Sequence, residues 1–102
     1  MENKQIEVSV IIATYNCCGY VRDAVESVLT QSLDNYEIII VDDGSTDETR
    51  QVLEPYLERA DIRYHFQPNA GISRARNWGI EMAKGKYVLI LDADDILSLI
   101  HI

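Results

Sequence analysis

Two aspartates near the end of the chain, Asp92 and Asp94, have the residue type and spacing of a site for a hard divalent cation. Such cations prefer carboxylate oxygens, and an Asp-x-Asp pair at a strand end can also divide its duties between a metal and a ligand hydroxyl. The alternative is a solvated turn, which is common where a strand reaches the surface. Because the pair follows an apolar run and adds charge to an acidic chain, the context favours a bound cation.

A second acidic pair, Asp42 and Asp43, follows another apolar run and precedes Gly44 and Ser45. Doubly wound nucleotide-binding sheets often place an acid at this position, against a ribose or a base. The alternative is helix capping, which Ser45 and Asp43 could provide. Capping leaves Asp42 less well explained, and both interpretations can hold at once.

A third polar cluster, Thr14-Tyr15-Asn16, follows the first apolar run of the chain. It lacks the G-x-G-x-x-G pattern that lets a backbone approach a dinucleotide pyrophosphate, since only Gly19 is nearby, and this weighs against an NAD or FAD domain. The chain also has no G-x-x-x-x-G-K-[ST] pattern, which excludes a P-loop NTPase at the level of motifs. Phosphate groups must therefore be bound by other means.

Elements of regular structure must bring these clusters together. Four apolar segments of strand length, rich in β-branched residues, are typical of strands buried in a parallel sheet; they cover residues 8–13, 36–41, 62–66 and 87–91. Between the first two, an apolar stripe at helical spacing predicts a helix over 21–29. In the second connection Ser45 could cap a helix, with Glu48 reaching back to it, and Pro55 should kink or end that helix.

The third connection predicts a helix after Ser73, with a final cationic turn and a glycine stop at Lys84-Gly85. Gly79 lies inside this helix and costs about 1 kcal/mol relative to alanine, which suggests close packing on the sheet rather than chemistry. The predicted apolar stripe consists of Ala75, Trp78, Gly79, Met82 and Ala83.

Strands that alternate with helices predict an α/β fold: an open, mostly parallel, Rossmann-like sheet of about four strands with helices on both faces. In such sheets, ligands bind beyond the carboxyl ends of the strands. All three polar clusters directly follow strands, so we expect them to meet at one edge.

The order and spacing of four motifs resemble family 2 glycosyltransferases with the GT-A fold. The motifs are VSVIIATYN at 8–16, VDDGSTDET at 41–49, Gly71 with ARNWG at 75–79, and LDADD at 91–95. The resemblance covers most of residues 8–95, and four motifs in order are far more specific than any one of them. It implies a nucleotide-diphosphate sugar as partner, with UDP as the expected nucleotide.

The resemblance also implies a role for each matching residue. Thr14, Tyr15 and Asn16, together with Asp42 or Asp43, would hold the nucleobase.

Asp92 would contact the ribose, and Asp94 would coordinate Mn²⁺ or Mg²⁺ that bridges the diphosphate, with Asp95 as a weaker candidate. Arg76 matches an arginine near the donor. A surface arginine is the alternative there, because only one of Arg74 and Arg76 can point inward.

Composition limits the other functions. Seventeen acidic residues against nine basic ones give a net charge of −8, which repels a phosphate backbone and argues against a nucleic-acid partner. The adjacent Cys17 and Cys18 fit neither a zinc site nor a disulfide framework, and reduced thiols suggest a cytoplasmic protein. No leader and no apolar run of membrane-spanning length is visible, so membrane attachment is expected only in a longer protein.

An inverting transfer needs a base that takes the proton of the acceptor hydroxyl. In the family, that base and the acceptor subdomain lie further along the chain, so we expect residues 1–95 to be a donor-binding half without activity of its own. The short apolar segment 96–102 is interpreted as the result of truncation, a frameshift or a cloned end. An uncovered edge of the last strand and an aliphatic tail predict self-association.

Two other functions remain as alternatives. Nucleotidyltransferases and sugar-nucleotide pyrophosphorylases have similar sheets, but they usually carry a Gly-rich turn with a lysine after the first strand, which residues 14–19 lack. A binding or assembly module without catalysis would use the sheet only as an interaction surface.

Overall fold

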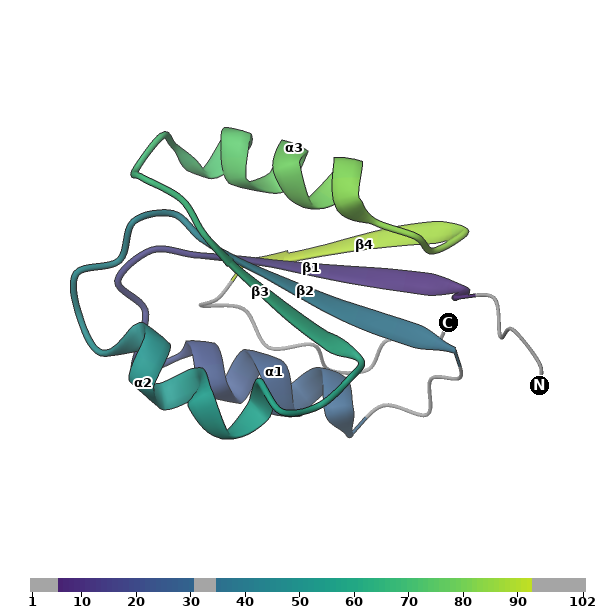
Figure 1. The fold of residues 1–102 in the computed structure, drawn as a ribbon, viewed down its shortest axis with the longest axis horizontal. Coiled ribbons are helices and arrows are strands. Elements are labelled where there is room, and N and C mark those ends of the chain that lie inside the picture. The colour runs from purple at the N-terminus through teal and green to yellow at the C-terminus, as the bar shows by residue number, and fades with distance from the viewer. Residues whose placement is uncertain (1–5, 31–34, 93–102) are drawn as a thin grey trace.

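The computed structural model describes residues 6–30 and 35–92, which form a parallel sheet between two layers of helices (Figure 1). The strand order is β3-β2-β1-β4, and every pair of neighbours is parallel. The fold is therefore the predicted α/β sheet. The elements are β1 (Val8–Thr14), α1 (Val21–Leu29), β2 (Tyr36–Asp42), α2 (Thr49–Leu53), the 3₁₀ turn η1 (Glu54–Tyr56), β3 (Ile62–Phe66), α3 (Ile72–Met82) and β4 (Tyr87–Asp92).

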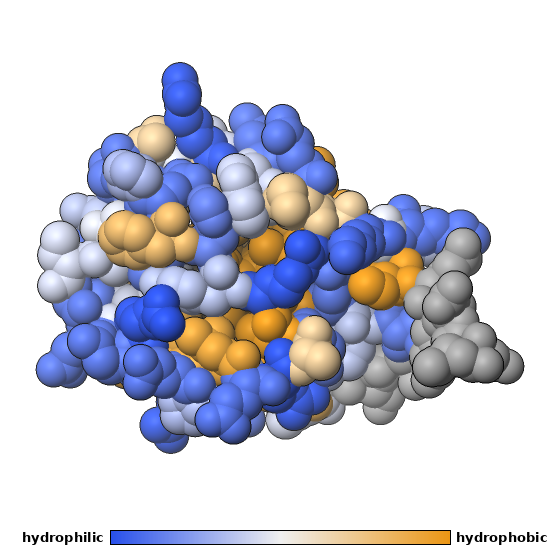
Figure 2. Space-filling model, viewed as in Figure 1, coloured by the Kyte–Doolittle hydropathy of each residue, from blue (hydrophilic) through white to orange (hydrophobic). Residues whose placement is uncertain are grey.

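The two central strands hold the core together. β1 is buried along its whole length, as an apolar strand covered on both faces must be. Helices α1 and α2 cover one face of the sheet and α3 covers the other (Figure 1). Figure 2 shows apolar side chains along a strip between these helical layers, framed by hydrophilic ones.

Helix α1 confirms the predicted apolar stripe. Val21, Ala24, Val25 and Val28 are all buried, and they pack on the same face of the sheet as Ile12 and Ile40. This burial fixes α1 along one face of the sheet, against β1 and β2.

Helix α3 confirms its predicted apolar stripe except at Met82: Ala75 and Gly79 are buried, and Trp78 and Ala83 pack against the core. A Cβ at Gly79 would lie 2.6 Å from Cγ2 of Ile11, so a side chain has no room there. Met82 was wrongly assigned to the buried face and is 39% exposed. The helix ends at Met82, and Ala83 is already extended, so Lys84 lies beyond the helix rather than in its last turn.

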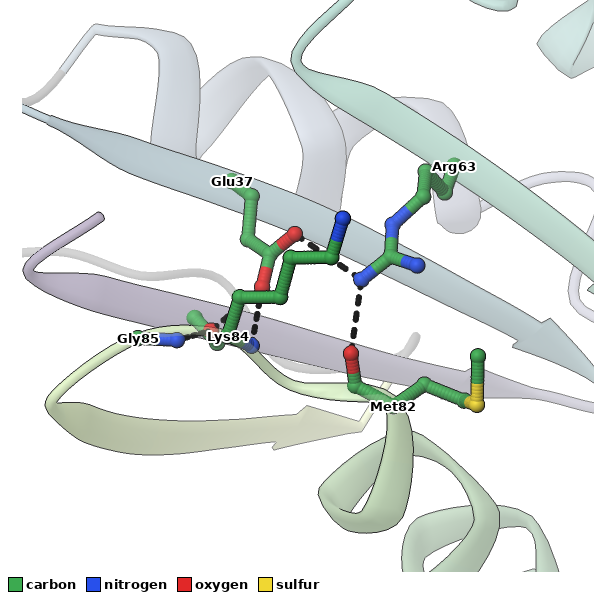
Figure 3. Close-up of polar contacts among 6 residues, drawn as sticks. Glu37, Arg63, Met82, Lys84 and Gly85 are labelled. Carbon is green, nitrogen blue, oxygen red and sulfur yellow. Dashed lines mark hydrogen bonds and ion pairs between the residues drawn. The ribbon is translucent and has the colours of Figure 1, made fainter. Parts of the chain in front are cut away.

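A buried glutamate explains why α3 ends there (Figure 3). The carboxylate of Glu37 in β2 accepts hydrogen bonds from the Ser9 hydroxyl at 2.6 Å and from the Lys84 backbone N–H at 2.7 Å. Arg63 Nη2 donates to Glu37 at 2.9 Å and to the carbonyl of Met82 at 2.8 Å. These bonds draw the chain onto the sheet directly after the last turn of α3.

The protonation of Glu37 follows from the same contacts. Burial alone would raise the pKa of Glu37, but the hydrogen bonds from Ser9 and the Lys84 N–H, together with the charge of Arg63, hold it below its ordinary value. Sequence reasoning missed this cluster, because only the sheet register shows that residues 9, 37 and 63 are neighbours.

The predicted start of the second helix was wrong. Helix α2 begins at Thr49, and its N-cap residue Glu48 makes no capping hydrogen bond with its side chain. Ser45 instead accepts a hydrogen bond from the backbone of Asn16, and the Thr49 N–H donates to Asp47 at 3.0 Å. The Ser45 side chain therefore bonds to a distant turn and does not cap the helix as its spacing suggested.

The predicted effect of Pro55 is confirmed. Helix α2 stops at Leu53, and the chain continues as η1 with Pro55 in its first turn. Proline lacks the N–H that an α-helix would need at this point.

Candidate functional site

The turns that follow β1 and β2 face each other at the carboxyl edge of the sheet and are joined by hydrogen bonds. The Asn16 N–H donates to Ser45 Oγ at 2.8 Å, and the Thr46 N–H donates to Asn16 Oδ1 at 2.8 Å. A third bond of 3.2 Å runs from the Cys18 N–H to the Asp47 carboxylate. Asn16 has φ of 50°, a left-handed conformation that asparagine tolerates better than most residues. We call these paired turns the rim.

Asp42 is buried beneath the rim. Its Oδ1 accepts the Ser45 N–H at 2.9 Å and its Oδ2 accepts the Tyr64 hydroxyl at 2.6 Å. Burial, followed by this bond and the nearby carboxylate charge, strongly raises the pKa of Tyr64, which therefore stays a donor. Arg50 lies over the Tyr64 ring, 5.1 Å from its centroid. Tyr64 was missed by sequence reasoning, because nothing in its strand pattern points to Asp42.

Asp43 points to the other face of the sheet and binds the segment that leads into α3. Its two carboxylate oxygens accept the backbone N–H groups of Ala70 and Gly71, at 2.8 and 2.9 Å. The side-chain amides of Gln67 and Asn69 add bonds of 2.9 and 3.3 Å. Burial alone would raise the pKa of Asp43, but the amide and N–H donors outweigh it and hold the pKa below its ordinary value.

Thr14 and Tyr15 differ sharply in exposure. Thr14 ends β1 and is buried, and its Oγ1 has no hydrogen-bond partner among the described residues. Tyr15, the next residue, is 43% exposed, so its ring does not pack in the core. The rim therefore presents one aromatic ring to solvent above a buried hydroxyl.

Helix α3 contributes Arg76, which is partly buried, whereas Arg74 is exposed. This difference agrees with the preference for Arg76 as the inward arginine. Trp78 lies on another side of α3 and stacks on His65 of β3, with ring centroids 3.6 Å apart and planes 9° apart. An open groove of about 640 Å³ runs past Trp78 and is bounded by residues 67–70.

The acidic motif at the chain end is described only in part. Asp92 ends β4, and its backbone is paired with Ala13, beside the turn that follows β1. Asp94 and Asp95 lie outside the described residues. Within residues 6–30 and 35–92, no three His, Cys, Asp or Glu side chains are grouped as metal ligands.

A parallel sheet with this strand order and these turns at its carboxyl edge matches the N-terminal region of GT-A glycosyltransferases. S. aureus TarS in complex with UDP-GlcNAc matches with a TM-score of 0.83 and 33% sequence identity, over 89% of this chain and 27% of that one. The mannosyltransferase PcManGT of Pyrobaculum calidifontis, in complex with GDP-Man and Mn²⁺, matches with a TM-score of 0.78 and 26% identity, over 93% and 29% of the two chains.

The sequence model of glycosyl transferase family 2 matches residues 9–99, and the chain belongs to this family. It is 48% identical over 98 residues to TuaG of Bacillus subtilis, which is named for teichuronic acid biosynthesis, and 47% identical over 96 residues to the glycosyltransferase YibD of Escherichia coli. Each alignment covers 93% of this chain but only 38% of TuaG and 28% of YibD. The chain is thus much shorter than these relatives. In its described part, no helix is both long and apolar enough to cross a bilayer.

Proposed function

We propose that this chain binds the nucleotide-diphosphate sugar donor of a family 2 glycosyltransferase, and that the nucleotide is UDP. The carrying observation is the adjacency of three strand ends in the order β2-β1-β4, with hydrogen bonds joining the turns after β1 and β2. Ligands of open α/β sheets bind at this edge. The complexes of TarS with UDP and UDP-GlcNAc lend support from a relative of the same fold.

The proposed nucleobase contacts are Thr14, Tyr15, Asn16 and one of the two aspartates that end β2. The exposed ring of Tyr15 and the orphaned hydroxyl of Thr14, for which the described residues offer no partner, support them. Arg76 would approach the diphosphate from α3, and Asp92 would contact the ribose.

The residues at this edge suit a hard cation. Aspartate oxygens are the ligands that Mn²⁺ and Mg²⁺ prefer, and Asp94 is the proposed metal residue. A chain of net charge −8 repels a diphosphate unless a cation is present. When bound, Mn²⁺ or Mg²⁺ would supply Lewis acidity that stabilises the departing nucleoside diphosphate. The solved structure of PcManGT is a complex with GDP-Man and Mn²⁺, which agrees with this choice.

The proposed reaction is inverting transfer of the sugar to an acceptor hydroxyl in polysaccharide biosynthesis. The name of TuaG, which refers to teichuronic acid biosynthesis, supports this by analogy.

Titration calorimetry with UDP and UDP-GlcNAc, each with and without Mn²⁺, tests the donor and the metal together. We expect binding that requires Mn²⁺ and is lost in Asp94→Ala. Asp61→Ala is the matched control, because Asp61 is paired with Arg59 at the opposite end of the sheet. Metal-independent binding, or equal affinity in Asp94→Ala and the parent, would contradict the proposal. A parallel titration with GDP tests the choice of nucleotide. Tighter binding of GDP than of UDP would contradict UDP as the nucleotide but not donor binding itself.

A second candidate is an assembly module without catalysis, which the exposed side chains of β4 favour. Val88 and Ile90 are 43% and 42% exposed on one face of that edge strand. A pure assembly module would bind nucleotide no better than an Asp42/Asp94 double variant, which calorimetry also measures.

A further inference from the structure

The rim contains a reciprocal contact that the glycosyltransferase assignment does not explain. Asn16 donates its backbone N–H to the Ser45 hydroxyl, and its side-chain oxygen accepts the N–H of Thr46, both at 2.8 Å. Two turns separated by 29 residues in sequence are thus joined through Asn16 on one turn and Ser45 and Thr46 on the other. We refer to this pair of bonds as the Asn16–Ser45 clasp.

Ser45 is itself held from below. Its backbone N–H donates to the buried carboxylate of Asp42, which also accepts the Tyr64 hydroxyl. The backbone of Ser45 is therefore held in place by Asp42, and this holds the Ser45 hydroxyl in position to accept the Asn16 N–H. A serine that only capped a helix would make its side-chain bond to its own helix, and Ser45 makes it to another turn.

The clasp helps to fix the backbone of Tyr15, whose two neighbours are both held in place. On one side of Tyr15, Thr14 is buried in the sheet and its carbonyl accepts the Asp43 N–H at 2.8 Å. On the other side, Asn16 is held in a left-handed conformation by the clasp. The backbone of Tyr15 is constrained at both ends while its ring stays 43% exposed.

We propose that Ser45 and Asn16 are positioning residues that preorganise Tyr15 for the donor nucleotide. The inference rests on the proposed function. It assigns Ser45 an indirect role, and it assigns Asn16 a positioning role in addition to its proposed nucleobase contact. A ring held in its binding position loses less conformational freedom when the nucleotide arrives, so affinity rises without any added contact.

A pair of serine variants tests this role by calorimetry with UDP and Mn²⁺. Ser45→Ala removes the acceptor for the Asn16 N–H and should weaken binding about threefold to tenfold, the effect of one lost hydrogen bond. Ser45→Thr keeps the hydroxyl and should restore the parent affinity. Thr30→Ala is the control, because the Thr30 hydroxyl donates to the carbonyl of Ser27 at the end of α1, away from the clasp.

A double-variant cycle separates positioning from simple stability. In a Tyr15→Ala background, Ser45→Ala should cause no further loss of affinity, because the residue that it positions is gone. A loss of the same size in both backgrounds would overturn the inference, and so would parent-like affinity of Ser45→Ala. Melting temperatures report on folding, and a role limited to stability would lower them without changing the affinity of the folded chain.

The clasp can also be examined without nucleotide. Amide hydrogen exchange should show a protected Asn16 N–H in the parent and in Ser45→Thr, and fast exchange in Ser45→Ala. Fast exchange in the parent would overturn the inference even if UDP binds. If the parent binds no UDP in the presence of Mn²⁺, the proposed function fails and the positioning role fails with it.

Discussion

The carboxylate of Asp43 accepts the backbone N–H of Gly71 at 2.9 Å and so joins the end of β2 to the start of α3. Gly71 is the N-cap residue of α3 and has φ of 104°, a conformation that favours glycine. The helix that carries Arg76 is therefore oriented by an acidic residue of the rim. The same carboxylate that the sequence offers as a ligand contact has a structural role in the protein.

Replacement of Asp43 should destabilise the fold as well as any site. Asp43→Asn retains one oxygen, but its amide group cannot accept the N–H groups now bonded to the other one. We expect the free energy of unfolding to fall by about 2 kcal/mol, the range for hydrogen bonds to a charged group in a buried position. Urea denaturation followed by circular dichroism measures the change, and an Asp43→Asn variant as stable as the parent would contradict it.

Acid should weaken the fold through its buried carboxylates. The pKa values of Glu37 and Asp43 lie below their ordinary values of 4.5 and 3.8 when the chain is folded. The unfolded chain therefore binds more protons in this range, and stability rises with pH. The contribution is complete above the ordinary values and is lost as the pH falls through the folded ones.

Urea titrations from pH 7 to pH 3 should show this loss directly. Glu37→Gln removes one of these two carboxylates. Its free energy of unfolding should be lower than that of the parent at pH 7, and it should fall less steeply as the pH decreases. An acid limb of unchanged slope in Glu37→Gln would contradict the role given to the Glu37 cluster.

A methyl group added at Gly79 should have no room between α3 and β1. Alanine improves helix propensity by about 1 kcal/mol, but its Cβ would lie 2.6 Å from Ile11 Cγ2. Overpacking of this kind costs about 1–3 kcal/mol, so we expect a net loss of stability in Gly79→Ala. Gly19→Ala is the control, because a Cβ there meets nothing within 4 Å. Equal changes in melting temperature for Gly79→Ala and Gly19→Ala would contradict the tight contact between Gly79 and Ile11.

Self-association should occur through β4. Helix α3 packs on β1 and β2, which leaves one face of the edge strand β4 uncovered at Val88 and Ile90. We expect light scattering to detect a dimer or larger species, and Val88→Lys to shift it toward the monomer. Phe66→Lys is the control, because Phe66 is 52% exposed on the opposite edge strand. A parent chain that is monomeric at high concentration would contradict this prediction.

Strands were the most predictable part of the molecule. The third strand was predicted with its observed bounds, and the other three extend by one residue at the carboxyl end, to Thr14, Asp42 and Asp92. A buried parallel strand can be recognised from its own residues, because they form a nearly continuous apolar run. The added residues are polar, and a polar residue at a strand end cannot be told from the first residue of a turn.

The contacts at the site could not be predicted in the same way. The position of Thr14 to Asn16 opposite Asp42 and Asp43 followed from topology, but the partners of each side chain depend on distant segments. Ser45 had the spacing of a cap and bonds to another turn instead. Tyr64 had the pattern of an ordinary strand residue, and its bond to Asp42 depends on the register of β3 against β2.

The stacked pair of His65 and Trp78 has a practical consequence. Trp78 is the single tryptophan of the chain, and it lies where α3 meets β3. Its intrinsic fluorescence therefore reports on one defined contact, the stack on His65. Separation of α3 from β3 can be timed by tryptophan fluorescence in a stopped-flow instrument without any added dye.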